Sequence, residues 1–409
     1  MEGVMDLWPA CANRAPMRPA LVVAREPFIA TLVPRGFRAG EASRLSVATE
    51  PRARSSRWWL VTAAIAVPAL SGRRQSGCTL GALTARRAVA AQTAAATAPS
   101  RSTVASDAGL LLLEHLNLNV LSTEVAMRFY EALGCRRDAR RTMTKTLHNN
   151  CGALTQFHTP SPDNEAFIAG SGAQRWRGDI ELLYASHADA DAAAARARAL
   201  LEDASFAGTK LAVNDGVEGS EFLIIGPYGN RFLLRVAEPH RQSALRPDSG
   251  ARPGSENCSC VGLGGVTLQV PPRTAERGAR FYADVLGFAV REVDAGRWAI
   301  LGGPGGESQR FVLEEVSDAS GEELGEHVAI YIGDFVGCFE RLLERGLIFV
   351  NPRFEHLDKS RTVEEALHYN CFRFKDIVDP ASGEKLFELE HEVRCTDHKS
   401  CPPALAETR

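Results

Sequence analysis

The sequence predicts an α+β protein built from four copies of one unit, in which a strand is followed by a helix and then by two or three further strands. Two segments of the chain, HLNLNVLSTEVAMRFYEALGC (115–135) and GVTLQVPPRTAERGARFYADVLGF (265–288), resemble each other. A weaker copy of the same strand–helix pattern follows each of them. A stretch rich in Pro, Ser and Gly separates the two halves of this pattern. Internal similarity of this kind indicates tandem supersecondary units.

The two stronger copies share a strand pattern and a helix pattern. Apolar residues alternate where each copy begins, which predicts a half-buried strand. The helices that follow have apolar residues at helical spacing and end at Gly134 and Gly287, where a residue tolerant of positive φ is favoured. The apolar helix positions are Phe129, Tyr130 and Leu133 in one copy, and Phe281, Tyr282, Val285 and Leu286 in the other.

The weaker copies are GDIELLYASHADADAAAARARALLED (178–203) and EHVAIYIGDFVGCFERLLERG (326–346). Strand candidates complete each of the four units. They are ALTQFHT, then FLIIGPYGNRFLLRV, then RWAILGG with RFVLEEV, and finally CFRFKDIVDPASGEKLFELEHEV. The pattern predicts domains at 110–238 and 261–394, with a linker at 239–260 and a tail at 395–409.

Composition excludes several classes of protein. The chain has 409 residues, 45% hydrophobic and 24% charged, which is ordinary for a globular protein. Its net charge of −3 hides an asymmetry, because residues 1–107 contain 14 arginines and 6 acidic residues and the remainder is about −11. An acidic body without a basic run argues against a nucleic-acid partner. The ten cysteines are scattered and only Cys258 and Cys260 are close together, so we expect a reducing compartment and no disulfide framework.

The first 107 residues have the composition of a leader that is disordered and later removed. They are rich in Arg, Ala and Ser, and arginines precede an apolar run from Trp58 to Leu70. This run is too short to span a bilayer but fits the apolar core of a signal peptide. The same Arg/Ser/Ala composition continues after it, as in leaders that direct proteins to plastids. A mitochondrial presequence is the alternative. We expect no membrane span in the mature protein.

The last strand candidate, LFELEHEVR (386–394), places three glutamates on one face, because successive side chains of a strand point to opposite sides. The row either faces water at a sheet edge, where it discourages pairing with other chains, or directs a carboxylate into a cavity.

Residues 110–394 resemble the vicinal oxygen chelate superfamily, which includes glyoxalase I and the extradiol dioxygenases. The motifs that carry the resemblance are H-x-x-L-x-V with RFYEALG, the related RFYADVLG, HVAIYI, and D-P-x-x-G followed by FELE. The resemblance implies four βαβββ modules that form two cupped mixed sheets, each around a cavity. It also implies a metal held by the first and last strands of the modules that share a sheet.

The family's ligand positions fall on His115 and Gln156 in the first unit and on His327 and Glu388 in the fourth. If the first unit pairs with the fourth, these four residues meet in one cavity. The second and third units then share a cavity without a credible ligand set: Asp179, Leu233, Gly265 and Glu314. Two histidines and a carboxylate suit a divalent ion such as Fe, Zn, Ni, Co or Mn.

The resemblance therefore implies a metalloenzyme acting on a small oxygenated substrate that chelates the metal, with lyase, isomerase or dioxygenase chemistry. Glu388 is the expected catalytic ligand, and His158 is an alternative ligand or a general base. A protein that keeps the fold but binds a ligand without a metal, or serves as a scaffold, is the other interpretation. The oligomeric state stays open.

Long connections often form lids or specificity elements. The segment 351–372 is of this kind, and His356, Arg361, His368 and Tyr369 are its candidate substrate contacts. The sequence gives no role to the remaining histidines beyond exposure to solvent: His187, His240, His391 and His398.

Overall fold

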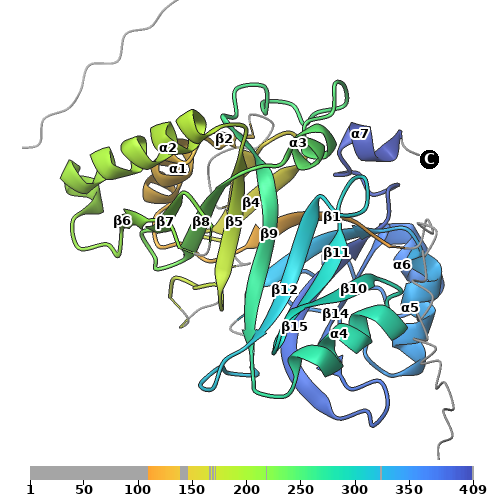
Figure 1. Ribbon diagram of the computed structural model, residues 1–409. Helices are drawn as coiled ribbons and strands as arrows, with labels where there is room; N and C mark the ends of the chain where they lie inside the picture. The colour runs from red at the N-terminus through yellow and green to blue at the C-terminus, as the bar shows by residue number, and fades with distance from the viewer. Residues whose placement is uncertain are drawn as a thin grey trace, which may run out of the picture. The chain divides into compact units, whose positions relative to one another are not determined.

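The computed structural model describes residues 109–138, 146–164, 167, 170, 172–217, 219–322 and 325–407. The predicted leader at 1–107 lies outside these residues. Within them strands and helices alternate in the predicted order, and the α+β class is confirmed (Figure 1). They all belong to one compact unit. No helix of this described part is long and apolar enough to cross a membrane.

The four predicted units are present as strand–helix–strand modules. The first contains β1 (Leu110–Asn117), α1 (Thr123–Ala132), β2 (Arg136–Arg137), β3 (Thr146–Cys151) and β4 (Thr155–Pro160). The second contains β5 (Asp179–Tyr184), α2 (His187–Ala199), β6 (Ala212–Asp215), β7 (Phe222–Ile225) and β8 (Arg231–Val236). Two short 3₁₀ turns, Leu200–Glu202 and Ala204–Phe206, follow α2.

The third and fourth modules repeat this order. The third contains β9 (Cys260–Val270), α4 (Ala275–Asp284), β10 (Ala289–Asp294), β11 (Arg297–Gly302) and β12 (Gln309–Glu315). The fourth contains β13 (His327–Ile332), α5 (Phe335–Glu344), α6 (Val363–Tyr369), β14 (Cys371–Val378) and β15 (Lys385–Arg394). Two helices lie outside the modules, α3 (Pro239–Leu245) in the predicted linker and α7 (Pro403–Ala406) in the tail.

The first helix of each half ends where the sequence predicts. Ser122 is the N-cap of α1, and its hydroxyl accepts a hydrogen bond from the Val125 amide. Gly134 and Gly287 follow α1 and α4 with φ of +88° and +78°, as predicted. The predicted apolar helix positions are all buried in one core, including Phe129 and Phe281.

Strand pairing joins the first module to the fourth and the second to the third. β1 pairs antiparallel with β13, and β5 pairs antiparallel with β9. The first set reads β2-β3-β4-β1-β13-β15-β14, and the second reads β6-β7-β8-β5-β9-β12-β11-β10. One parallel bridge, Leu110 to Gly302, links the two sets, so the 15 strands form one continuous mixed sheet where two separate sheets were expected.

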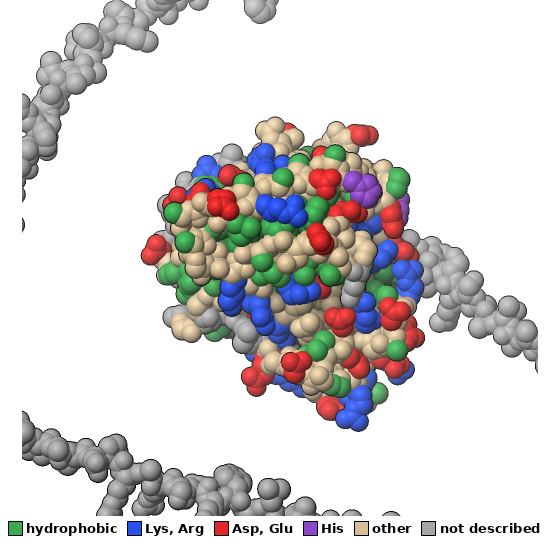
Figure 2. Space-filling view, turned by 60° about the vertical axis from the view of Figure 1, so that its left-hand side comes forward, with side chains coloured by type: hydrophobic (Ala, Val, Ile, Leu, Met, Phe, Trp, Pro, Cys, Tyr) green, Lys and Arg blue, Asp and Glu red, His purple; other side chains and the backbone are tan. Residues whose placement is uncertain are grey.

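The segment predicted as a linker is packed against the modules. Arg241 and Arg252 are both buried. Arg241 donates to the backbone carbonyls of Gly264 and Ser308. Arg252 donates to the carbonyl of Leu154. On the face of the molecule shown in Figure 2, basic and acidic side chains are intermingled.

Candidate metal centre

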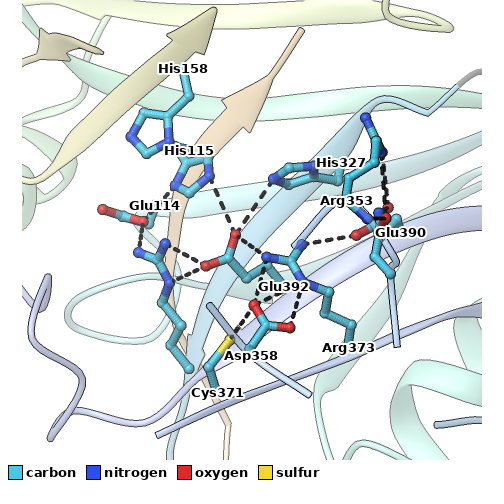
Figure 3. A network of polar contacts seen from close by, with 12 residues as sticks. Glu114, His115, His158, His327, Arg353, Asp358, Cys371, Arg373, Glu390 and Glu392 are labelled. Carbon is cyan, nitrogen blue, oxygen red and sulfur yellow. Dashed lines mark hydrogen bonds and ion pairs between the residues drawn. The ribbon is translucent and has the colours of Figure 1, made fainter. Parts of the chain in front are cut away.

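Three ligand side chains of the first and fourth modules converge. Ala329 of β13 pairs with His115 of β1 on one side and with Glu392 of β15 on the other, so these two residues lie level in the sheet. His327 begins β13, two residues earlier. The Glu392 Oε2 atom lies 3.5 Å from His327 Nε2 and 3.9 Å from His115 Nε2. Figure 3 shows both rings directed at this carboxylate.

The carboxylate that lies beside both histidines is Glu392, whereas the predicted Glu388 lies elsewhere in the sheet. Alternation alone predicts the same side of β15 for both residues, but a register shift in the pairing with β14 lies between them, and the pairing of β15 with β13 begins with Glu390 opposite His327. Glu388 lies before that point. Its side chain pairs with Lys385, and its Oε1 atom is 3.7 Å from Lys375 Nζ. Four strand residues span about 13 Å, so Glu388 belongs to a different part of the sheet.

Glu114 fixes the tautomer of His115. A β-bulge between Leu113 and His115 interrupts the alternation of β1, and the side chains of Glu114 and His115 meet. His115 Nδ1 lies 2.7 Å from Glu114 Oε2. Burial raises the pKa of Glu114, but Arg252 and Arg394 outweigh this and hold the pKa well below its usual range. The ionised carboxylate only accepts, so Nδ1 carries the proton and Nε2 carries a lone pair.

Burial lowers the pKa of His115, which keeps its ring neutral. Among the described residues no hydrogen-bond partner reaches His115 Nε2 or either ring nitrogen of His327, although these atoms are buried. Buried polar atoms are almost always satisfied, so two such rings facing one carboxylate indicate a missing partner. A cation between the three groups would satisfy the Nε2 atoms of both rings and the carboxylate oxygen that faces them.

Two arginines hold Glu392 in place. Arg394 Nε donates to Glu392 Oε1 at 2.6 Å, and Arg373 Nη2 lies 3.0 Å from Oε2. Burial raises the pKa of Glu392, but Arg394 and Arg373 lower it well below its usual value. Arg373 also donates to Asp358 and to Glu390 (Figure 3).

Gln156 and His158 lie beside the triad without joining it. The side-chain oxygen of Gln156 is 2.9 Å from His158 Nε2, and its nitrogen donates to Asp138 and Asn150. The prediction that Gln156 is a ligand is therefore not matched by its placement. The His158 ring stacks on the His115 ring with centroids 3.7 Å apart. Burial, then His115 and His148, lower the pKa of His158 well below 6.5.

The triad lies at a cavity of about 570 Å³ between the first and fourth modules. Phe354 of the long segment 351–372 packs edge-on against His327, with ring centroids 5.4 Å apart. Three of the four predicted contacts from this segment line the cavity: His356, His368 and Tyr369. Arg361 instead pairs with Glu355 at 3.0 Å. His398 lines the cavity too, and His391 is buried, so the exposure expected of these two histidines is wrong.

The second and third modules also enclose a cavity, of about 310 Å³. Asp179, Leu233 and Gly265 line it, as expected from the cross-pairing. Asp179 pairs with Arg231, and Glu314 pairs with Arg297. Of the two groups of possible metal ligands in the described part of the chain, neither lies in this cavity.

The sequence analysis missed the charged residues around the triad. Glu114 is adjacent to His115, and simple alternation would place it on the opposite face of the sheet. Arg394 alternates in phase with the glutamates of β15, which was an available signal, whereas Arg373 lies opposite Glu392 through a strand pairing that the local sequence does not show. Arg252 lies in a segment whose composition predicts a linker, and nothing in its neighbourhood indicates burial.

Comparison with known proteins gives no matching family model and no matching curated protein. Solved structures do match. A dioxygenase-like protein from Bacillus subtilis has a TM-score of 0.44 at 12% identity, covering 71% of this chain and 86% of that one. A glyoxalase I variant from Zea mays has a TM-score of 0.40 at 14% identity, covering 70% and 93%.

A 2,3-dioxygenase from Pseudomonas has a TM-score of 0.24 at 13% identity, covering 70% of this chain and 93% of that one. At these identities and scores the matches identify neither substrate nor reaction. By name, these matched structures are of the glyoxalase I and dioxygenase types.

Proposed function

We propose that the chain is a metal-dependent enzyme whose small oxygenated substrate binds a divalent ion held by His115, His327 and Glu392. One observation carries the proposal. Two buried imidazoles without partners among the described residues converge on one carboxylate, with nitrogen–oxygen distances of 3.5 and 3.9 Å. Metal–ligand bonds of about 2.0–2.2 Å fit ligand atoms at these separations.

The fixed tautomer of His115 strengthens this assignment. Its unprotonated Nε2 faces the Glu392 carboxylate, and two electron-rich atoms so placed repel each other unless a cation lies between them. The other ring nitrogen, Nδ1, is hydrogen-bonded to the Glu114 carboxylate. Histidines that bind a metal commonly donate their second ring N–H to a carboxylate in this way. A divalent ion here would supply Lewis-acid polarisation of substrate oxygens.

The cavity favours a polar substrate. Its lining includes Asn117, Thr146, His148 and Asn164 from the first module and His368 from α6. His158 lies beside the triad as a neutral ring whose Nε2–H donates to the Gln156 side-chain oxygen, so its Nδ1 is left as a hydrogen-bond acceptor. In this proposal the strands of the first and fourth modules form the cup that the family resemblance implies, and the reaction is of the lyase, isomerase or dioxygenase type.

A metal-free binding protein is the second candidate, and the arginines favour it. Arg373 and Arg394 already neutralise Glu392, so the carboxylate has less to gain from a cation than an unpaired one would. The two candidates differ in whether the purified protein retains a divalent ion at His115, His327 and Glu392.

Metal content of purified variants decides between them. We expect the histidine–glutamate centre to hold about one first-row divalent ion per chain, and His115→Ala, His327→Ala or Glu392→Gln should lower the metal content of the purified protein by about that one ion. Glu388→Gln is the matched control, because it makes the same change in the same strand outside the triad and should leave retention unchanged. If Glu392→Gln retains metal as the unaltered protein does, the triad is not the site.

Activity assays then separate the reactions. A lyase or isomerase should convert the adduct of glutathione and a 2-oxoaldehyde without consuming oxygen, whereas a ring-cleaving dioxygenase should consume oxygen with a catechol.

We also propose that residues 1–107 direct the chain to a plastid. A fluorescent protein fused behind this segment should accumulate there, and accumulation in mitochondria would contradict the plastid assignment.

A further inference from the structure

Four cysteines that are far apart in the sequence meet at a second place in the molecule. Cys135 follows α1, and Cys151 ends β3. Cys258 and Cys260 lie at the start of β9, in the other half of the chain. The C-x-C sequence alone lacks a second pair of thiols, and the fold brings up that pair from the first module.

Three of these thiols face one another. The sulfurs of Cys135, Cys151 and Cys260 all lie within 4.8 Å of one another, and all three residues are fully buried. The Cys151 and Cys260 sulfurs are 3.9 Å apart. Cys258 is half-buried next to this group, and its thiol donates to the carbonyl of Asn150 at 3.3 Å.

The spacing fits a metal–thiolate site. With zinc–sulfur bonds of about 2.3 Å, the sulfurs of a tetrahedral site lie about 3.8 Å apart, close to the observed separation. A disulfide would need the two sulfurs at about 2.0 Å and would leave a third thiol facing it without a partner.

The surroundings favour a closed site, because the Cys135, Cys151 and Cys260 side chains are buried. Arg136 and Arg196 lie close by, since they bond to the Cys135 carbonyl and the Ser259 hydroxyl. Structural zinc sites are closed in this way and keep no open position for a substrate.

We propose that Cys135, Cys151 and Cys260 form a structural site for a thiophilic d¹⁰ metal ion such as Zn²⁺, with Cys258 as the fourth ligand at its outer side. The ion joins α1 and β3 of the first module to the start of β9. It therefore fastens the two halves of the chain beside the hydrogen bond from the Ser259 amide to the Gly134 carbonyl. This site is independent of the histidine–glutamate centre.

Cobalt substitution tests the proposal in the full chain. The double variant His115→Ala/His327→Ala is used so that only the cysteines bind. Co²⁺ added under reducing conditions should give sulfur-to-cobalt charge-transfer absorption that saturates at one ion per chain, and Zn²⁺ should abolish it. Cys151→Ser or Cys260→Ser in that background should remove the absorption, and Cys258→Ser should weaken binding at least tenfold. Cys338→Ser is the control, because Cys338 is a buried cysteine of α5 outside the cluster.

A second measurement uses the unaltered chain, so that the proposal can still be tested if a cysteine variant does not fold. In the unaltered chain, Zn²⁺ should protect Cys258 from alkylation, mapped by mass spectrometry, while Cys401 reacts as before. Absence of the charge-transfer band together with unprotected Cys258 would overturn the proposal. A Cys151–Cys260 disulfide that survives in freshly purified protein would also overturn it.

Discussion

Glu392 shows how single residues determine the character of the centre. It contacts two imidazoles on one side and two guanidinium groups on the other. Arg373 is itself surrounded by Asp358, Glu390 and Glu392, so the buried acids and bases nearly balance. A divalent ion adds two positive charges to this balanced group. An anionic substrate would restore neutrality, which agrees with a substrate that chelates through ionised oxygens.

At the same scale, the buried His391 makes the free energy of unfolding depend on pH. Its ring is buried, stacks on Phe374 with centroids 4.3 Å apart, and lies 3.0 Å from the Tyr282 hydroxyl. Burial lowers the pKa of His391 to about 3. The unfolded chain therefore binds a proton that the folded chain does not, between about pH 6.5 and 3. The contribution of the neutral His391 ring to stability is present in full above pH 6.5. As the pH falls below this value, the free energy of unfolding decreases by at most about 1.4 kcal/mol per pH unit.

We expect His391→Phe to flatten the fall in the free energy of unfolding between pH 6.5 and 4, measured by urea denaturation. His115 and His158 contribute in the same direction, so some fall should remain. Tyr282→Phe is the control, because it removes the hydroxyl and keeps the buried histidine, and its slope should match that of the unaltered chain. An unchanged slope for His391→Phe would contradict the low pKa.

At the scale of elements, the sequence predicts which helices and strands form, and in what order, better than it predicts the register in which the strands pair. Apolar periodicity and Gly134 or Gly287 located the helices that cover the sheet. Alternation put Glu388 and Glu392 on one face of β15, but only the pairing with β13 decides which of them reaches the histidines. Alternation also fails at Glu114, because the bulge in β1 adds a residue that periodicity does not anticipate. Long-range pairing and bulges depend on the partner strand, which the local sequence does not contain.

The two helix-ending glycines Gly134 and Gly346 allow a test of local geometry. Both have positive φ, +88° and +67°. A Cβ at Gly134 would lie 2.1 Å from the Ser259 hydroxyl, whereas a Cβ at Gly346 meets nothing within 4 Å. Gly346→Ala should cost about 1 kcal/mol for the backbone conformation alone. Gly134→Ala should cost about 1–3 kcal/mol more, because overpacking adds to it. Urea denaturation midpoints measure the loss of stability in both variants. Equal losses would show that the Ser259 side chain moves aside freely.

At the scale of the whole molecule, the cross-pairing makes neither half complete. The half that ends before β9 contains β1 and β5, each of which pairs with a strand of the other half. Its separation would expose two strand edges and part of the shared apolar core. The triad is divided in the same way, since His115 belongs to the first half, and His327 and Glu392 belong to the second.

We therefore expect residues 1–248 and 249–409, expressed separately, to aggregate or remain unfolded. The cut falls between Asp248 and Ser249, which are exposed and lie outside every strand and helix of the described chain. Expressed together, the two fragments should copurify as a 1:1 complex with the circular dichroism spectrum of the intact chain. The complex should also retain metal, because only the assembled pair brings the histidines to Glu392. Fragments that purify as stable, separately folded monomers would contradict the cross-paired architecture, and with it a metal centre that needs both halves.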